Sequence, residues 1–277
     1  MNWITPIIYF SIYVGLIATT FYILSYLDYK KKERKFFSED KFPFVSVLIP
    51  AYNEEKTIAR TIESILKTDY PRDRFEIIVI NNNSKDKTFE ISKKYENSIL
   101  KVYTEKKQGK ACALNFGLSK AKGEIIFTMD ADTQVNPDSV KKMIQPFTNP
   151  RVMGVTPAML VYSHKNIWER IQQMEYFMGV FLRKAFATLN AVYITPGAFS
   201  CYRKGFFEKH GGYDEDNITE DIEISLRMQY KGYFIDNCPD AVAYTVVPKT
   251  FKSLFIQRRR WYFGYLKNIL KYRGLLN

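Results

Sequence analysis

Histidine and cysteine are scarce in this sequence, with two histidines and three cysteines among 277 residues. His164 and His210 are too few for a histidine-rich metal site and make a Ser-His-Asp triad an unpromising interpretation. The cysteines show no CxxC spacing, so they suggest neither a zinc knuckle nor a disulfide framework. We expect reduced, mostly buried thiols at Cys112, Cys201 and Cys238. Any proton transfer is therefore assigned to carboxylates.

Glycine-rich phosphate motifs are missing as well. No GxGxxG occurs, which disfavours a dinucleotide enzyme, and the region around Gly109 lacks the other residues of a Walker loop. Positive charge is abundant: the formal net charge of +12 fits phosphorylated substrates, nucleic acid or an acidic membrane face. The basic residues are dispersed rather than gathered on a wide surface with stacking aromatics, so we expect no nucleic-acid partner.

The first 27 residues carry no charged side chain. This stretch is long enough to cross a bilayer, which needs about 20 apolar residues, and it lacks the basic start and cleavage site of a secretory signal. We predict a transmembrane anchor over residues 1–29 and a basic juxtamembrane linker over 30–42; a buried core helix is the alternative. Basic residues beside a span stay cytoplasmic, which predicts that the chain after Lys30 faces the cytosol.

Strand-like apolar runs alternate with helical spacing from residue 43 onward. The predicted strands are Phe44–Ile49, Glu76–Ile80, Ile99–Tyr103 and Glu124–Met129, and the predicted helices between them are Glu54–Lys67, Thr88–Tyr95 and Lys110–Lys120. This alternation predicts an α/β domain over 43–250 with a mainly parallel central sheet. In such sheets, ligands bind at the carboxyl ends of the strands.

The later segments are less regular. Lys165–Leu189 is predicted as a long helix rich in aromatics and Met, and Ile222–Lys231 as a shorter one. Phe251–Tyr272 mixes aromatic and basic residues, which suits an amphipathic helix in a membrane interface over 251–277. Docking of this helix on the protein itself is the alternative.

A carboxylate pair, Asp130 and Asp132, directly follows the apolar run Glu124–Met129. At the end of a strand such a pair projects into the ligand crevice. Hard cations such as Mg²⁺ or Mn²⁺ bind oxygen ligands, usually one or two carboxylates together with substrate phosphates. The pair predicts a divalent-metal site, although solvated acidic pairs in loops are common.

Thr219-Glu220-Asp221 stands directly before the predicted helix Ile222–Lys231. As a structural feature it is a helix start, with Thr219 as the capping residue and the acids stabilised by the helix dipole. A carboxylate here can also serve as the general base that deprotonates an attacking hydroxyl. The two roles do not exclude each other.

A basic run ending in tryptophan, Gln257-Arg258-Arg259-Arg260-Trp261, lies in the last predicted helix. Such runs are usually a solvated face or a contact to phosphate or lipid. A Trp beside Arg can stack on a sugar or a base, or anchor in a membrane interface.

Three segments that follow the first strands suit a nucleotide. After the first strand, Tyr52 can stack on a base, and Asn53 or Glu54 can hydrogen-bond it; otherwise the segment is a capped helix start. Asn82 lies in a run of three Asn after the second strand, which is otherwise a plain polar turn. Lys110, beside Gly109 at a predicted helix start, suits a phosphate.

The order of these motifs is more specific than any one of them. PAYNEE, the polar turn, QGKACALN, DAD, PGAF, TED and QRRRW follow one another between residues 50 and 261. In this the chain resembles the family-2 inverting glycosyltransferases, especially the membrane branch that contains hyaluronan, chitin, cellulose and poly-N-acetylglucosamine synthases. TED and QxxRW together are quite specific within that family.

The resemblance implies a GT-A fold with a nucleotide half at about 43–135 and an acceptor half at about 136–250. It implies a membrane enzyme with a cytoplasmic catalytic domain that uses Mn²⁺ or Mg²⁺. A hexose or N-acetylhexosamine would pass from a nucleotide-diphosphate sugar to a hydroxyl of a saccharide or glycolipid acceptor. The one-step displacement would give a β-linkage, and the lipid bilayer would be a further partner.

The resemblance also carries residue roles. It places Tyr52 and Glu54 at the nucleobase, with Asn53, Asn82, Lys110 and Asp130 also in the nucleotide site. Asp130 and Asp132 would bind the metal and the diphosphate. It assigns Asp221 as the base beside Glu220, sets Gly197 of PGAF near the acceptor sugar, and closes Gln257, Arg260 and Trp261 over the diphosphate and the acceptor end.

Two departures matter. Where the family usually has Asp-Asp-Gly-Ser, this chain has three Asn and then Ser84. Asn lacks the carboxylate that commonly accepts a hydrogen bond from uracil N3–H, although its amide oxygen can also accept one. UDP is therefore still favoured, and GDP-mannose stays open. Processive relatives continue into further membrane helices; the final LKYRGLLN resembles their lead-in, which favours a truncated chain over a non-processive enzyme.

Two alternative functions stay open. The same fold can glycosylate a polyprenyl phosphate, but that acceptor is already ionised and needs no base, so TED and QxxRW argue against it. A membrane-tethered nucleotide-binding protein without turnover would be expected to lose the metal or base carboxylates. Asp130, Asp132 and Asp221 are all present.

Overall fold

The four apolar runs of the N-terminal half form neighbouring parallel strands in the computed structural model, which describes residues 3–31 and 36–276. β1 lies between β2 and β4, and β3 pairs with β2 at the edge of the sheet. Each strand begins and ends within two residues of its predicted bounds, so this part of the prediction is confirmed. The strands are β1 (Val45–Ala51), β2 (Phe75–Asn81), β3 (Leu100–Thr104) and β4 (Ile125–Met129).

The second half of the sheet is mixed, in the order β3-β2-β1-β4-β7-β6-β8-β5. β7 is antiparallel to β4 and β6, β6 is parallel to β8, and β5 is antiparallel to β8. These strands were not among the predicted elements, because polar residues and prolines interrupt the apolar runs of the two long ones and β6 pairs with β8 through register shifts. Their bounds are β5 (Gln134–Val135), β6 (Val152–Val161), β7 (Phe199–Arg203) and β8 (Phe234–Thr245).

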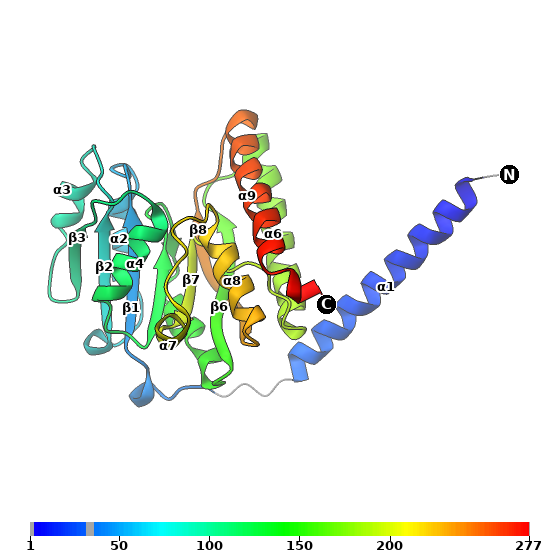
Figure 1. Ribbon diagram of the computed structural model, residues 1–277, viewed down its shortest axis with the longest axis horizontal. Helices are drawn as coiled ribbons and strands as arrows, with labels where there is room; N and C mark the ends of the chain where they lie inside the picture. Colours follow the sequence, from blue (N-terminus) through cyan, green and yellow to red (C-terminus); the bar gives the residue numbers. More distant parts are fainter. Residues whose placement is uncertain (1–2, 32–35, 277) are drawn as a thin grey trace.

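Short helices cover both faces of this sheet (Figure 1). Successive strand residues point to opposite faces: Val47 and Ile49 of β1 belong to one core, and Leu48 belongs to the other. The first core is covered by α2 (Ile58–Leu66), α3 (Thr88–Lys93) and α5 (Ser139–Met143), and the second by α4 (Lys110–Lys120), α7 (Lys204–His210) and α8 (Glu220–Tyr230). Single 3-10 turns lie at Glu39–Lys41, Arg72–Arg74, Gln145–Thr148 and Arg273–Leu276.

The helix predicted from Glu54 begins four residues later, at Ile58. Asn53 has a left-handed backbone (φ 56°), and the segment that follows it forms a turn. The backbone N–H of Glu54 donates to the Thr88 hydroxyl (2.7 Å), and that of Glu55 donates to Asp86 (3.1 Å). The loop after β2 therefore satisfies the amide groups that a helix start would leave free.

Two long helices run parallel to each other at one end of the sheet, α6 (Ile167–Thr188) and α9 (Phe251–Lys271) (Figure 1). Both begin with a capping box, formed by Asn166 with Glu169 and by Thr250 with Ser253. Contacts recur at a constant sequence offset. Asn166 donates to the Lys249 carbonyl (3.3 Å), the ring of Trp168 lies 5.3 Å from that of Phe251, and Glu175 pairs with Arg258.

The N-terminal helix α1 (Ile4–Lys31) projects away from the sheet (Figure 1). Ile4–Ser25 has a mean hydropathy of 2.0 and is long and apolar enough to cross a bilayer. Near its end, the Tyr22 ring lies 5.1 Å from that of Phe181 on α6. The predicted linker is described only in part, because residues 32–35 lie outside the described residues, as do residues 1–2 of the predicted anchor.

The three cysteines are buried thiols outside any disulfide, as predicted: Cys112 on α4, Cys201 on β7 and Cys238 on β8.

Candidate active site

The residues predicted for the nucleobase lie in the loop after β1, at the carboxyl edge of the sheet. The Tyr52 side chain is exposed, which leaves its ring free to stack. Asn53 accepts from the Lys85 backbone N–H (2.8 Å), and Glu54 accepts from the Thr57 hydroxyl (2.6 Å). The loops after β1 and β2 thus form one hydrogen-bonded unit beside the exposed Tyr52.

Asn82 is buried, and its amide is engaged at both ends. Its nitrogen donates to the carbonyls of Glu105 (3.2 Å) and Lys107 (2.7 Å), and its oxygen accepts from the Gly109 N–H (2.8 Å). The side chain therefore positions the loop that leads to Lys110. Its contact with a nucleobase stays a prediction.

The carboxylates of Asp130 and Asp132 follow β4, as expected. Two backbone contacts hold their turn: the Asp130 N–H donates to the Ala198 carbonyl (3.0 Å), and the buried Thr61 hydroxyl of α2 donates to the Ala131 carbonyl (2.8 Å). Burial, and then the charges of Asp130 and Glu54, raise the pKa of Asp132 to about 7. Negative charge is therefore concentrated at this turn.

The donor set at this turn fits a divalent cation bound together with phosphates. Across residues 3–31 and 36–276, no group of three or more His, Cys, Asp or Glu is arranged to hold a metal by itself. Two carboxylates completed by substrate phosphate oxygens are a common arrangement for Mg²⁺ and Mn²⁺. A cation would also neutralise the charge that raises the pKa of Asp132.

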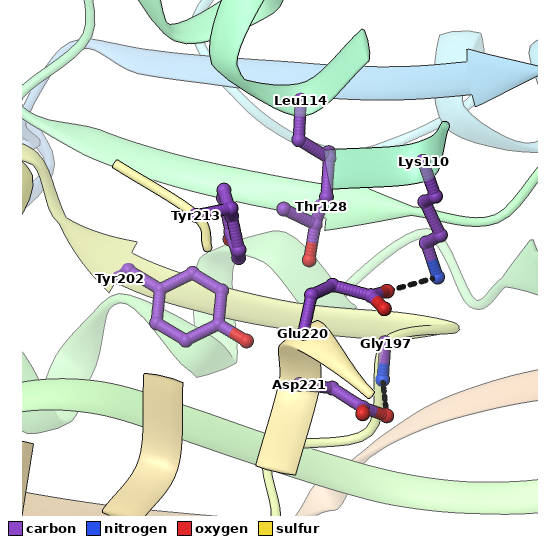
Figure 2. A pocket seen from close by; sticks show the side chains of 8 residues that line it. All are labelled: Lys110, Leu114, Thr128, Gly197, Tyr202, Tyr213, Glu220 and Asp221. Atoms are coloured by element: carbon purple, nitrogen blue, oxygen red, sulfur yellow. Dashed lines mark hydrogen bonds and ion pairs between the residues drawn. The ribbon is translucent and has the colours of Figure 1, made fainter. Parts of the chain in front are cut away.

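Lys110 connects the turn after β4 with the start of α8. Its ammonium lies 2.6 Å from Asp130 Oδ1 and 3.0 Å from Glu220 Oε1 (the second pair is drawn in Figure 2). Burial acts against its charge, but the carboxylates of Asp130, Glu220 and Asp221 outweigh burial and raise the pKa of Lys110. The side chain predicted to hold a nucleotide is thus also the bridge between the turn after β4 and the start of α8.

The two acids at the start of α8 have opposite electrostatic environments. Burial acts to raise the pKa of Glu220, but Lys110 outweighs it and holds that pKa below the usual value. Burial and the charge of Glu220 raise the pKa of Asp221 to about 6, against the pull of Lys110. Glu220 is therefore the ionised partner of Lys110, and Asp221 has a pKa suited to taking up a proton.

The segment Gly197–Ala198 connects both acidic sites through consecutive backbone groups. The Gly197 N–H donates to Asp221 Oδ2 (3.2 Å; Figure 2), and the Ala198 carbonyl accepts from the Asp130 N–H. A Cβ on Gly197 would lie 2.8 Å from Lys110 Nζ. A Cβ here would displace the Lys110 ammonium, which Asp130 and Glu220 hold in place.

The capping role expected of Thr219 is not what the structure shows. Within the described chain, its side chain makes no capping bond to α8. Its hydroxyl instead accepts from the Asn268 amide of α9 (3.0 Å). Asp221 takes over the local contact, since its Oδ1 accepts from the Ile222 N–H (2.9 Å).

The basic run lies on α9. Some of its residues act on the site, and Arg258 holds the helix in place. Arg260 contributes to the low pKa of Glu220, so its charge lies within range of the site. Gln257 Oε1 is buried without a hydrogen-bond partner within the described residues, which leaves an acceptor for a ligand hydroxyl. Arg258 pairs with Glu175 of α6 and lies 4.4 Å from the centre of the half-buried Trp261 ring, so it holds the helix and its tryptophan.

Two residues of the site were missed by sequence reasoning. Thr61 holds the Asp130–Asp132 turn from α2. Tyr176 of α6 is a half-buried phenol whose pKa is raised to about 12, first by desolvation, with the charges of Asp132 and Asp130 adding to the effect. Neither residue belongs to a motif, so no local signal marks them.

Residues 46–211 match the family described as glycosyl transferase family 2. The chain belongs to this family. Poly-β-1,6-N-acetyl-D-glucosamine synthase of Staphylococcus aureus strain COL is 32% identical over 258 residues, which cover 92% of this chain and 62% of that protein. The chain thus spans less than two thirds of the length of the curated relatives it matches.

Solved structures share the fold. Mannosyltransferase PcManGT from Pyrobaculum calidifontis, in complex with GDP-Man and Mn²⁺, has a TM-score of 0.72 and 25% identity, covering 94% of this chain and 74% of that one. S. aureus TarS 1-349 in complex with UDP-GlcNAc has a TM-score of 0.57 and 21% identity, covering 74% of this chain and 59% of that one. The predicted family and the predicted α/β glycosyltransferase fold are both confirmed.

Proposed function

We propose that this chain is a membrane-anchored inverting glycosyltransferase that moves a sugar from a nucleotide diphosphate onto a hydroxyl of a saccharide acceptor. The observation that carries the proposal is the half-buried Asp221 carboxylate, which accepts from the Gly197 N–H and whose pKa is raised to about 6 by desolvation and by the charge of Glu220. A carboxylate with that pKa can accept a proton near neutral pH. It lies beside a Lys110–Asp130 pair suited to a diphosphate.

The residues then have separate tasks in a single displacement. Asp221 takes the proton of the acceptor hydroxyl while the acceptor oxygen bonds to the anomeric carbon and the bond to the diphosphate breaks. Lys110 offers positive charge to the leaving diphosphate, and Arg260 adds to it. A divalent cation at Asp130 and Asp132 would supply Lewis-acid stabilisation of the same leaving group. Because attack and departure occur on opposite faces, an α-linked donor gives a β-linkage.

The donor we favour is UDP-N-acetylglucosamine. The curated relatives are named as poly-β-1,6-N-acetyl-D-glucosamine synthases, and TarS was solved with UDP-GlcNAc. PcManGT was solved with GDP-Man and Mn²⁺, which keeps GDP-mannose in the test and supports a divalent metal. In this proposal Tyr52 and Glu54 contact the nucleobase, and Gln257 and Trp261 contact the sugars.

Three apolar surfaces support the proposal that this chain contacts a lipid bilayer. α1 has a membrane-spanning length, and α6 and α9 each turn one apolar face to solvent. The exposed residues on α6 are Ile167, Ile171, Met174, Phe177, Met178 and Phe181, and those on α9 are Phe251, Phe255, Ile256, Tyr262, Phe263, Leu266 and Leu270. Contiguous apolar surface of this kind marks a membrane or protein contact. We infer that both helices lie against the cytoplasmic leaflet.

The reaction is tested with the detergent-extracted chain, Mn²⁺, a β-linked N-acetylglucosamine oligomer and either UDP-GlcNAc or GDP-mannose. We expect nucleotide release and oligomer extension with one donor, a β-anomeric product by NMR, and loss of transfer in Asp221→Asn. Transfer to a polyprenyl phosphate that persists in Asp221→Asn would replace this proposal with the lipid-phosphate reaction. Nucleotide binding without turnover on any acceptor would indicate a non-catalytic protein.

Membrane orientation can be tested with one introduced thiol. The native cysteines are buried, so Glu90→Cys on the exposed face of α3 would provide the reactive thiol for a membrane-impermeant maleimide. We expect labelling in inside-out vesicles and none in intact cells. The reverse pattern would overturn the cytoplasmic assignment.

A further inference from the structure

The helix that carries Gln257, Arg260 and Trp261 meets the catalytic body at two buried positions, Gly264 and Asn268. They are four residues apart and therefore lie on the same side of the helix. The residues they contact belong to the turn that leads into α8. This contact joins α9, which carries the QxxRW motif, to the turn that directly precedes Glu220 and Asp221.

Gly264 allows the two elements to approach each other closely. A Cβ at this position would lie 2.3 Å from Thr219 Oγ1 and 2.4 Å from Thr219 Cγ2. Real side-chain atoms do not approach so closely, so alanine would force α9 away from the turn. Gly264 lies within α9 at an ordinary helical position, so the need for glycine comes from this contact.

Asn268 completes a closed polar cluster. Its side chain is fully buried, and its nitrogen donates to Thr219 Oγ1 (3.0 Å) and to Asn217 Oδ1 (3.2 Å). Asn217 donates back to Asn268 Oδ1 (2.7 Å) and accepts from the Thr219 N–H (3.1 Å). Each side chain thus satisfies the others, so any sliding of α9 along α8 would leave buried amide groups unpaired.

The apolar contact between the same helices lacks this directionality. Ile222, Leu226 and the Tyr272 ring form its buried part, with Ile269 packed at its side; the Tyr272 hydroxyl donates separately to Glu223 of α8. Burial of apolar surface stabilises docking without specifying one height or rotation. Hydrogen bonds depend on distance and angle, and a single buried Asn is a known device for fixing helix register.

We propose that Asn268 is a positioning residue for sugar transfer: through Asn217 and Thr219 it sets the height of α9 over the turn, so that Arg260 and Trp261 face Asp221 in the right register. Trp261 precedes Gly264 by one helical turn, so the register of the cluster is passed on to it directly. This inference rests on the proposed function for the reaction it serves. The contact itself does not depend on that function.

The test uses the full chain in detergent with four variants. Asn268→Ala removes the amide, Thr219→Val keeps the shape but removes the hydroxyl, and Thr219→Ser restores the hydroxyl. Ile269→Ala is the control, because it weakens the apolar contact of the same interface and leaves the polar cluster intact. For each, kcat at saturating substrates, nucleotide affinity by calorimetry and the unfolding midpoint are measured.

We expect Asn268→Ala and Thr219→Val to lower kcat by at least about tenfold while nucleotide affinity stays within about threefold, because misplacement of catalytic groups costs rate before it costs binding. Thr219→Ser should keep kcat within about threefold of the unmodified chain. Ile269→Ala should lower the unfolding midpoint with kcat kept. An unchanged kcat in Asn268→Ala, or an equal loss in Ile269→Ala, would overturn the positioning role.

Hydrogen exchange separates this inference from the proposed function, since it requires no turnover. Amide groups of residues 251–261 should exchange faster in Asn268→Ala than in Ile269→Ala, because the first variant frees the register of the helix. If the unmodified chain transfers no sugar, the proposed function fails and exchange still tests the cluster. Equal exchange in both variants would overturn it.

Discussion

The backbone N–H of Gly197 donates to the Asp221 carboxylate at 3.2 Å. The next residue, Ala198, accepts from the Asp130 N–H through its carbonyl (3.0 Å). A two-residue segment therefore sets the distance between the proposed base and the proposed metal site. Lys110 spans the same gap with its side chain, 2.6 Å from Asp130 and 3.0 Å from Glu220.

Gly197→Ala should lower kcat by about tenfold or more, because the new Cβ displaces the Lys110 ammonium, and a displacement of catalytic groups by about 1 Å costs about 100-fold. The new Cβ would meet Lys110 Nζ at 2.8 Å and Asp221 Oδ2 at 3.3 Å. The matched control is Gly205→Ala on α7, where an added Cβ meets no atom of the described chain within 4 Å. Steady-state kinetics of both variants checks this, and equal activity in the two would contradict it.

The pH dependence of transfer should show an acid limb near the pKa of Asp221, about 6. The carboxylate is the active form, so kcat/KM is kept above this pH and falls about tenfold per unit below it. Because the Glu220 charge helps raise this pKa, Glu220→Gln should move the limb to lower pH. Glu215→Gln, at an acid paired with Lys107 outside the site, should leave it in place. A limb that stays fixed in Glu220→Gln would refute the assignment.

Lys110→Met should destabilise the fold as well as the reaction. It would leave Asp130 and Glu220 without their shared cation, and loss of one partner from a partly buried, hydrogen-bonded charge cluster costs about 1–3 kcal/mol. The unfolding midpoint should fall by several degrees. Lys107→Met removes an exposed pair with Glu215 and should have little effect. Equal midpoints in the two variants would contradict the bridging role.

Asp132→Asn should lower nucleotide affinity in Mn²⁺ by at least about tenfold, because metal and diphosphate bind together. In chelator, the variant and the unmodified chain should bind nucleotide equally. Calorimetry under both conditions makes the comparison, and a loss that persists in chelator would remove Asp132 from the metal site.

Thr61→Val should weaken metal-dependent nucleotide binding up to about tenfold, since residues that hold a ligand in place contribute to metal affinity. Its hydroxyl donates to the Ala131 carbonyl between the two aspartates (2.8 Å). Thr68→Val is the control, because that buried hydroxyl donates to the nearby Ile65 carbonyl (2.7 Å) and not to the Asp130–Asp132 turn. Calorimetry with Mn²⁺ compares them, and an equal change in both variants would argue for a general effect on α2.

Local patterns were sufficient for the N-terminal half of the domain. The apolar runs of β1 to β4 and the spacing of α4 depend on neighbouring residues, so their bounds follow from the sequence. The motif order also identified the family, because the motifs are short segments, most of them at the ends of elements and QRRRW within α9. The anchor helix α1 follows from composition alone.

The remaining features depend on tertiary packing. β6 and β8 depend on their partners, since their own residues include proline and polar side chains. Thr219 and Asn268 are 49 positions apart and meet only because α9 docks on α8. The apolar face of α6 becomes visible only once its opposite side is packed against the sheet. Sequence patterns report periodicity within an element, whereas hydrogen bonds between distant elements depend on which surfaces the fold brings together.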